Sequence, residues 1–125
     1  MTATNFKVVS RLTGDVAVLR PQGYLNNLAG ESLVTECNSY IARGIRKVVL
    51  NFSGTDFINS IGISLLLNIM EGLEEGGGTL CFTNLRKIHS DTFEILGLMD
   101  HMLVFGDEDE ALRYFSLPAP HDDTA

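Results

Sequence analysis

Apolar positions along the chain recur with two different spacings, and the places where the spacing changes separate predicted strands from predicted helices. Residues 6–11 and 15–20 read as two strands around a tight turn at residues 12–14, and Pro21 suits a strand end or edge. Residues 46–52 form a continuous apolar run that is typical of a central strand covered on both faces. Further extended segments are predicted at Gly23 and Tyr24, at residues 79–85 and at residues 101–106.

Four segments show the helical spacing of apolar residues. The first begins near Asn26 or Asn27, either of which could cap it, and stops at Gly44. The second follows a predicted turn at residues 53–57, runs from Ser60 to Glu75 and ends in three glycines. The last two helices are predicted within residues 86–99 and 107–117, the latter begun by acidic residues at its positive dipole end.

The alternation of strands and helices predicts an α/β fold. Helical crossovers between strands favour parallel pairing, and the opening hairpin adds an antiparallel component, so the sheet should be mixed. A chain of 125 residues, 45% of them hydrophobic, suits a single domain with its own core. We expect that domain to cover residues 1–117, followed by a disordered tail at 118–125 that Pro118 and Pro120 introduce.

Composition and charge narrow the possible partners. A formal net charge of -7 argues against general binding to nucleic acid, which requires clustered Lys and Arg, and favours a basic or mixed-charge protein surface as partner. No apolar stretch reaches the roughly 20 residues of a membrane span, and the N-terminus lacks a secretory pattern. We therefore expect a soluble, cytoplasmic protein without membrane contact. Cys37 and Cys81 lie in apolar segments and are expected to be buried free thiols.

Motifs for catalysis or for metal and phosphate binding find no support in the sequence. The histidines at 89, 101 and 121 are dispersed, so we expect no metal site. The glycines at 76–78 follow a helix and open a strand, whereas a phosphate-binding loop follows a strand and opens a helix. No nucleophile motif or paired acid and base is recognisable. We expect neither an enzyme nor a cofactor.

The stretch "FINSIGISLL" at residues 57–66 places Asn59 and Ser60 where a strand-like run gives way to a helix-like run. Ser60 could simply cap the helix, which would contribute roughly 0.5 to 2 kcal/mol. Asn59 can already cap, however, and Gly62 costs about 1 kcal/mol in helix propensity, which implies a need for close approach. A hydroxyl at this edge of an open α/β sheet is also where such folds place sites.

The segment "VVLNFSGTDFINSIGISLLL" resembles the signature of the STAS domain, as found in bacterial anti-sigma-factor antagonists. The signature is an apolar strand, a Gly-containing turn and then Asp-Ser-x-Gly opening a helix. The resemblance extends over about residues 6 to 115 and includes the "VAVLRPQGYL" strand and the "ILGLMDHMLVF" passage. It implies a mixed sheet of about four or five strands with about four helices, mostly packed on one side.

The resemblance also implies a function. Ser60 would be the residue phosphorylated by a partner anti-sigma factor that is a serine kinase. The unphosphorylated domain would bind that partner and release a sigma factor, and a PP2C-type phosphatase would reset it. We expect a monomer or a weak homodimer. The partner-binding surface is predicted to contain Asn26, Ile58, Asn59, Ser60, Ile61, Gly62, Ser64 and Asn68.

Two positions depart from the family pattern. Asn59 stands where the family has an acidic residue before the serine, and Asn26 replaces an acidic residue that commonly follows the third extended segment. These changes motivate an alternative hypothesis, a STAS scaffold or adaptor that docks without phosphorylation. A third hypothesis is a small-ligand-sensing STAS domain, although nothing in the sequence marks a ligand pocket.

Overall fold

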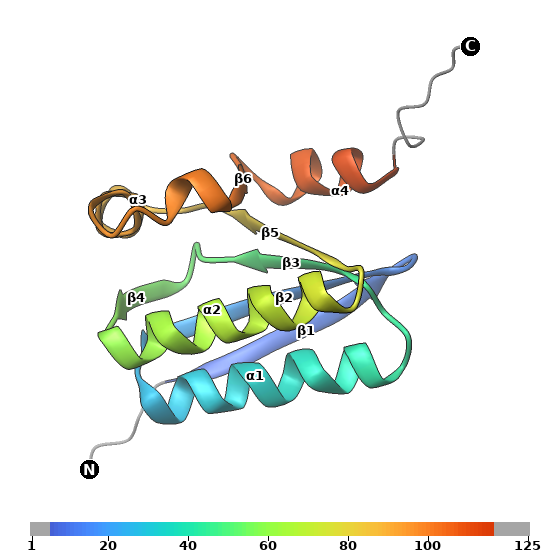
Figure 1. Ribbon diagram of the computed structural model, residues 1–125, viewed down its shortest axis with the longest axis horizontal. Coiled ribbons are helices and arrows are strands. Elements are labelled where there is room, and N and C mark those ends of the chain that lie inside the picture. Colours follow the sequence, from blue (N-terminus) through green and yellow to red (C-terminus); the bar gives the residue numbers. More distant parts are fainter. Residues whose placement is uncertain (1–5, 117–125) are drawn as a thin grey trace.

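The computed structural model describes residues 6–116, which form a mixed sheet and four α-helices (Figure 1). The predicted tail at 118–125 lies outside the described residues. The strands are β1 (Lys7–Thr13), β2 (Val16–Leu25), β3 (Lys47–Asn51), β4 (Thr55–Ile58), β5 (Thr79–Thr83) and β6 (Leu103–Phe105). The helices are α1 (Asn27–Ala42), α2 (Ser60–Glu75), α3 (Lys87–Ile95) and α4 (Glu108–Ser116), with a short 3₁₀ turn at Met99–His101.

The strand order is β1-β2-β3-β5-β6, with β4 paired to the far end of β2. The β1–β2 hairpin is antiparallel and the other pairings are parallel, which confirms the predicted mixed α/β sheet. The count of six strands is higher than expected, because the predicted turn at residues 53–57 contains β4. Only Ser53 and Gly54 form the turn, and Thr55 then pairs with Gly23 of β2.

The strand β2 continues through the residues where the sequence suggested a break. Its first half pairs with β3 up to Leu19, and its second half pairs with β4 at Gly23 and Leu25. Pro21 falls between these two stretches, where neither parallel partner is in register with it, so its missing N–H leaves no gap in those ladders. Its carbonyl oxygen accepts a 2.6 Å hydrogen bond from the Thr55 hydroxyl, which helps to hold β4 against β2.

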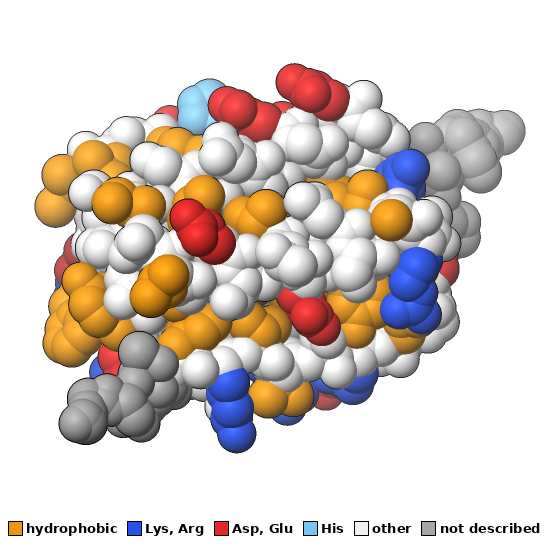
Figure 2. Space-filling view, turned by 90° about the horizontal axis from the view of Figure 1, so that it is seen from below, with side chains coloured by type: hydrophobic (Ala, Val, Ile, Leu, Met, Phe, Trp, Pro, Cys, Tyr) orange, Lys and Arg blue, Asp and Glu red, His pale blue; other side chains and the backbone are white. Residues whose placement is uncertain are grey.

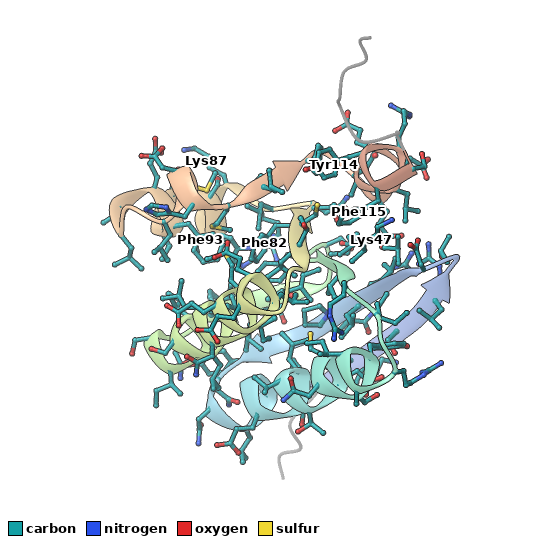
Figure 3. The ribbon with its side chains drawn as sticks, turned by 45° about the vertical axis from the view of Figure 1, so that its right-hand side comes forward. Lys47, Phe82, Lys87, Phe93, Tyr114 and Phe115 are labelled. Atoms are coloured by element: carbon teal, nitrogen blue, oxygen red, sulfur yellow. The ribbon has the colours of Figure 1, made fainter. Side chains whose placement is uncertain are left out.

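Most of the core lies between one face of the sheet and the helices α1 and α2, which run side by side in Figure 1. The two helices approach closely at Gly30, where an added Cβ would lie 2.4 Å from Leu65 Cδ1. Phe93 of α3 joins the same core against Phe82 of β5, and the labelled rings lie close together in Figure 3, with centroids 6.5 Å apart. The expectation that helices pack mostly on one side is therefore confirmed.

The helix α4 covers the opposite face of the sheet, where Ala111 and Phe115 pack over Val16, Val49 and Cys81. Figure 3 shows Tyr114 and Phe115 on this helix, away from the Phe82 and Phe93 cluster. Both cysteines are buried free thiols, as predicted, and burial raises the pKa of each to about 12. Among residues 6–116, no helix is long and apolar enough to cross a membrane.

An ionic cluster attaches the start of α4 to the sheet. The Glu108 carboxylate accepts hydrogen bonds from Arg20 at 2.7 and 2.8 Å and from the Asn51 amide at 2.6 Å, and Arg11 lies 3.3 Å away. The hydrogen bonds from Arg20 lower the pKa of Glu108 to about 2, with further help from Asn51 and Arg11. Glu108 is therefore ionised at neutral pH and stabilises the docked position of α4.

Candidate functional site

Two asparagines begin the two long helices at the same end of the molecule. The Asn59 side-chain oxygen accepts a hydrogen bond from the Gly62 N–H at 2.8 Å and caps α2. Asn26 caps α1 in the same way, through a 3.0 Å bond from the Ala29 N–H. The capping role predicted for Asn59 is confirmed, and of the two candidates for α1, Asn26 is the cap.

Ser60 is the first residue of α2, and its side chain is exposed. Because Asn59 provides the cap, the Ser60 hydroxyl is not needed to hold the helix start. The backbone N–H groups of Ser60 and Ile61 precede the first intrahelical bond, which runs from the Ile63 N–H to the Asn59 carbonyl oxygen. An exposed hydroxyl therefore stands beside two backbone donors at the positive end of a 16-residue helix.

Gly62 permits a close approach, but the approach is inside the molecule. A Cβ at this position would lie 2.4 Å from the Leu25 carbonyl oxygen and 3.2 Å from Ile58 Cγ2. The Leu25 oxygen also accepts a hydrogen bond from the Asn59 N–H at 3.1 Å. Gly62 is buried, so its role in the structure is to let α2 begin directly against the end of β2.

The other predicted surface residues are distributed along the exposed side of this helix start. Ile61 is 51% exposed, and Ser64 and Asn68 are also exposed on the following two turns. The Ser64 hydroxyl donates to the Ser60 carbonyl oxygen at 3.2 Å, so the two serines are stacked on one face. Ile58, at the end of β4, is half-buried. Except for Gly62, these residues are exposed or half-buried and make up the surface around Ser60.

Exposed apolar side chains that the sequence did not single out border this surface. Tyr24 of β2 and Phe57 of β4 are 48% and 60% exposed, and their rings meet edge to face with centroids 6.4 Å apart. Leu28 in the first turn of α1 is 64% exposed. Figure 2 shows hydrophobic side chains gathered at the left-hand end of the molecule, where Figure 1 places β4 and the starts of α1 and α2. We call Tyr24, Leu28, Phe57 and Ile61 the apolar rim.

A small cavity opens between β4 and α3, next to Phe57. Its volume is about 80 Å³, and its walls include Phe57, Ile58, Ile88 and Phe93. His89 also lines the cavity and is buried, and its Nε2 lies 3.0 Å from the Asp56 carbonyl oxygen. Since a carbonyl oxygen only accepts, Nε2 must carry the proton. Burial lowers the pKa of His89, so the ring is neutral at neutral pH.

A model of the STAS domain matches residues 7–111 of the sequence. The chain belongs to the STAS domain family. This confirms the resemblance drawn from residues 48–67 and extended to about residues 6 to 115. The match runs from β1 into α4, so the family's fold accounts for nearly all of the described residues.

Individual relatives agree with this assignment. The candidate anti-sigma factor antagonist BtrV of Bordetella bronchiseptica is 28% identical over 99 residues, which cover 79% of this chain and 85% of BtrV. The Bacillus cell fate determinant SpoIIAA in its phosphorylated form is 26% identical, with a TM-score of 0.68 over 88% of this STAS domain chain and 98% of SpoIIAA. The unphosphorylated form of the anti-sigma factor antagonist SpoIIAA gives 23% identity and a TM-score of 0.71, covering 90% and 99% of the two chains.

Proposed function

We propose that this STAS domain is an anti-sigma factor antagonist whose partner is an anti-sigma factor with serine kinase activity. The unphosphorylated domain binds this partner through the surface around Ser60, and the sigma factor is released. Phosphorylation of Ser60 ends the complex, and a PP2C-type phosphatase restores the binding form. Function in this proposal is partner exchange and not catalysis.

The observation that carries the proposal is the exposed Ser60 hydroxyl beside a helix cap supplied by another residue. A kinase can modify this hydroxyl without removing a hydrogen bond that the fold needs. The attached phosphate, with about -1.5 to -2 charges, would lie at a helix N-terminus, where backbone N–H groups and the helix dipole favour an anion. The modified domain should therefore stay folded.

The apolar rim supports a switch in binding. A phosphate on Ser60 would lie beside Ile61, which is half exposed, and close to the other apolar side chains at this end of the molecule. Burying a dianion against such a surface has a large desolvation penalty. A loss of about 3 kcal/mol in binding free energy weakens an interface more than 100-fold. Modification of one serine is enough to separate the partners.

The neutral residues Asn59 and Asn26 are compatible with this scheme. An asparagine side-chain oxygen caps a helix about as well as a carboxylate, and both asparagines do so here. Replacing the family's acidic residues thus keeps the caps and leaves less negative charge beside a phosphorylated Ser60. The phosphorylated form in which SpoIIAA has been solved supports phosphorylation as a mode of control in this family.

The proposal is tested with the serine kinases of the anti-sigma factor type encoded in the source genome. Each is purified and incubated with the domain and ATP, and the modified residue is mapped by mass spectrometry. We expect one phosphate on Ser60 and none on the S60A variant. The S64A variant is the matched control, because Ser64 is an exposed serine one turn further along α2. A kinase that binds the domain tightly but leaves Ser60 unmodified would refute phosphorylation control.

A second measurement separates the switch from a scaffold that docks without phosphorylation. In the switch, Ser60→Asp lowers the affinity for the kinase partner, whereas Ser64→Asp has a much smaller effect. In the scaffold, Ser60→Asp binds with unchanged affinity. Isothermal titration calorimetry on the two variants and the unmodified domain decides between these functions.

A further inference from the structure

The cavity between β4 and α3 continues the surface that contains Ser60. Ile58 belongs to both, because it lines the cavity and lies two residues before Ser60. Phe57 also lines the cavity and is itself 60% exposed, with the Tyr24 ring edge to face against its own. A partner that covers Ser60 and the apolar rim would therefore lie over the mouth of this cavity.

The chemistry of the walls indicates what can enter. Four of the lining side chains are apolar, and Ile88 at the mouth is 49% exposed. The single ionisable ring in the wall, His89, donates its Nε2 proton to the Asp56 carbonyl oxygen within the domain. That bond joins α3 to β4 and holds the two sides of the cavity in place. The interior thus presents an uncharged and largely apolar surface.

The size of the cavity restricts its occupant further. An apolar cavity of about 150 Å³ in another protein binds benzene. A volume of about 80 Å³ is therefore suited to a branched aliphatic side chain of about four carbons rather than to an aromatic ring. Asp56 is the one acidic residue that lines the cavity; its side chain is exposed, and its carboxylate lies 3.8 Å from the Arg86 guanidinium. This lining is compatible with a polypeptide partner whose backbone and polar groups remain at the surface.

We propose that this cavity is an anchoring pocket that receives one aliphatic side chain, such as Leu or Ile, from the anti-sigma factor that binds over Ser60. The proposal rests on the proposed function and adds a second element to the same interface. Ser60 controls whether the partner binds, whereas the pocket provides affinity through burial of an apolar anchor. Interface residues that fill such pockets are typically the ones whose loss weakens binding most.

The test fills the pocket without touching Ser60. Thr92 lines the cavity, and its hydroxyl donates only to the Ile88 carbonyl oxygen within α3. In Thr92→Leu the larger side chain occupies the space that the anchor would take. We expect its affinity for the purified kinase partner, measured by isothermal titration calorimetry, to fall by about tenfold or more, the loss typical of a blocked hot spot.

The matched control is Ser90→Leu on the same helix. Ser90 likewise donates its hydroxyl to a carbonyl oxygen of its own helix and does not line the cavity. This variant adds the same apolar side chain and should bind as the unmodified domain does. Thermal unfolding and circular dichroism of both variants verify that they are folded. Equal affinities for Thr92→Leu, Ser90→Leu and the unmodified domain would overturn the proposal.

If Thr92→Leu does not fold, nuclear magnetic resonance on the unmodified domain in complex with the partner tests the pocket directly. With methyl-labelled Ile in the domain and methyl-labelled Leu, Ile and Val in the partner, nuclear Overhauser contacts are expected between Ile88 and one partner methyl group. Contacts to Ile61 but none to Ile88 would overturn the pocket and leave the proposed function intact. If no kinase bound the domain, or if none phosphorylated Ser60, the proposed function itself would be contradicted.

Discussion

Asn59 caps α2 and leaves the Ser60 hydroxyl free of that role. This division can be tested by comparing the free energies of unfolding of variants at the two positions. The Asn59 side chain makes a 2.8 Å bond to the Gly62 N–H, and replacing such a cap by Ala costs about 0.5 to 2 kcal/mol. The Ser60 side chain is exposed and lies outside the cap, and substitutions at such positions usually stay within about 0.5 kcal/mol. N59A should therefore be clearly less stable than S60A.

Urea unfolding followed by circular dichroism provides the assay. Small domains have urea m-values of roughly 1 to 3 kcal/mol/M, so a loss of about 1 kcal/mol moves the midpoint by roughly 0.3 to 1 M. We expect this shift for N59A, little or none for S60A, and none for N59D, because Asp also caps and carries a charge that the helix dipole favours. If S60A were as destabilised as N59A, Ser60 would share the capping role and the reasoning about a free hydroxyl would be wrong.

Three further predictions concern other parts of the domain. G62A places a methyl group 2.4 Å from the Leu25 carbonyl oxygen; such overpacking should cost about 1 to 3 kcal/mol in the free energy of unfolding, seen in the same urea assay. E108Q removes a carboxylate whose pKa is lowered to about 2, and at pH 7 it should cost about 1 to 2 kcal/mol, since partial exposure screens the pair. The ionised Glu108 stabilises the fold above its ordinary pKa of 4.5, so the difference between E108Q and the unmodified domain should shrink as the pH falls from 4.5 toward 2; a difference constant with pH would refute this. Cys37 and Cys81, buried and with pKa values of about 12, should react with a thiol reagent at pH 8 only in denaturant.

Most of the fold was predicted from the sequence because apolar residues recur at a clear spacing in the long helices and strands. The helices α1 and α2 and the strand β3 follow from apolar spacing, caps and glycine stops. Residues 53–57 were predicted as a turn because they begin with Ser53 and Gly54, and the strand β4 that starts at Thr55 is too short to show a period. Helix α3 ends earlier than the predicted segment 86–99, at Ile95, because the chain turns at Gly97 with a φ of 75°.

The candidate site was predicted only as far as it is contiguous in sequence. Ser60 and its neighbours stand out because strand and helix signals meet there. The apolar rim and the pocket combine Tyr24 of β2, Phe57 of β4 and Ile88 of α3, which only the parallel pairing of β4 with β2 and the packing of α3 bring together. Taken singly, Tyr24 and Ile88 read as ordinary strand and helix positions and Phe57 as part of a turn, so no local pattern could identify them.

The change of partner along β2 divides the domain into two regions of unequal resistance to local opening. In its first half, β2 is bonded to β3 over four consecutive register positions, from Val16 to Leu19. In its second half it meets β4 only at Gly23 and Leu25, with an irregularity between them. Segments with fewer protected backbone bonds open at lower free energy. Hydrogen exchange at the β4 amides should therefore be faster than at the β3 amides, so the strand directly before Ser60 is expected to open while the rest of the sheet stays closed.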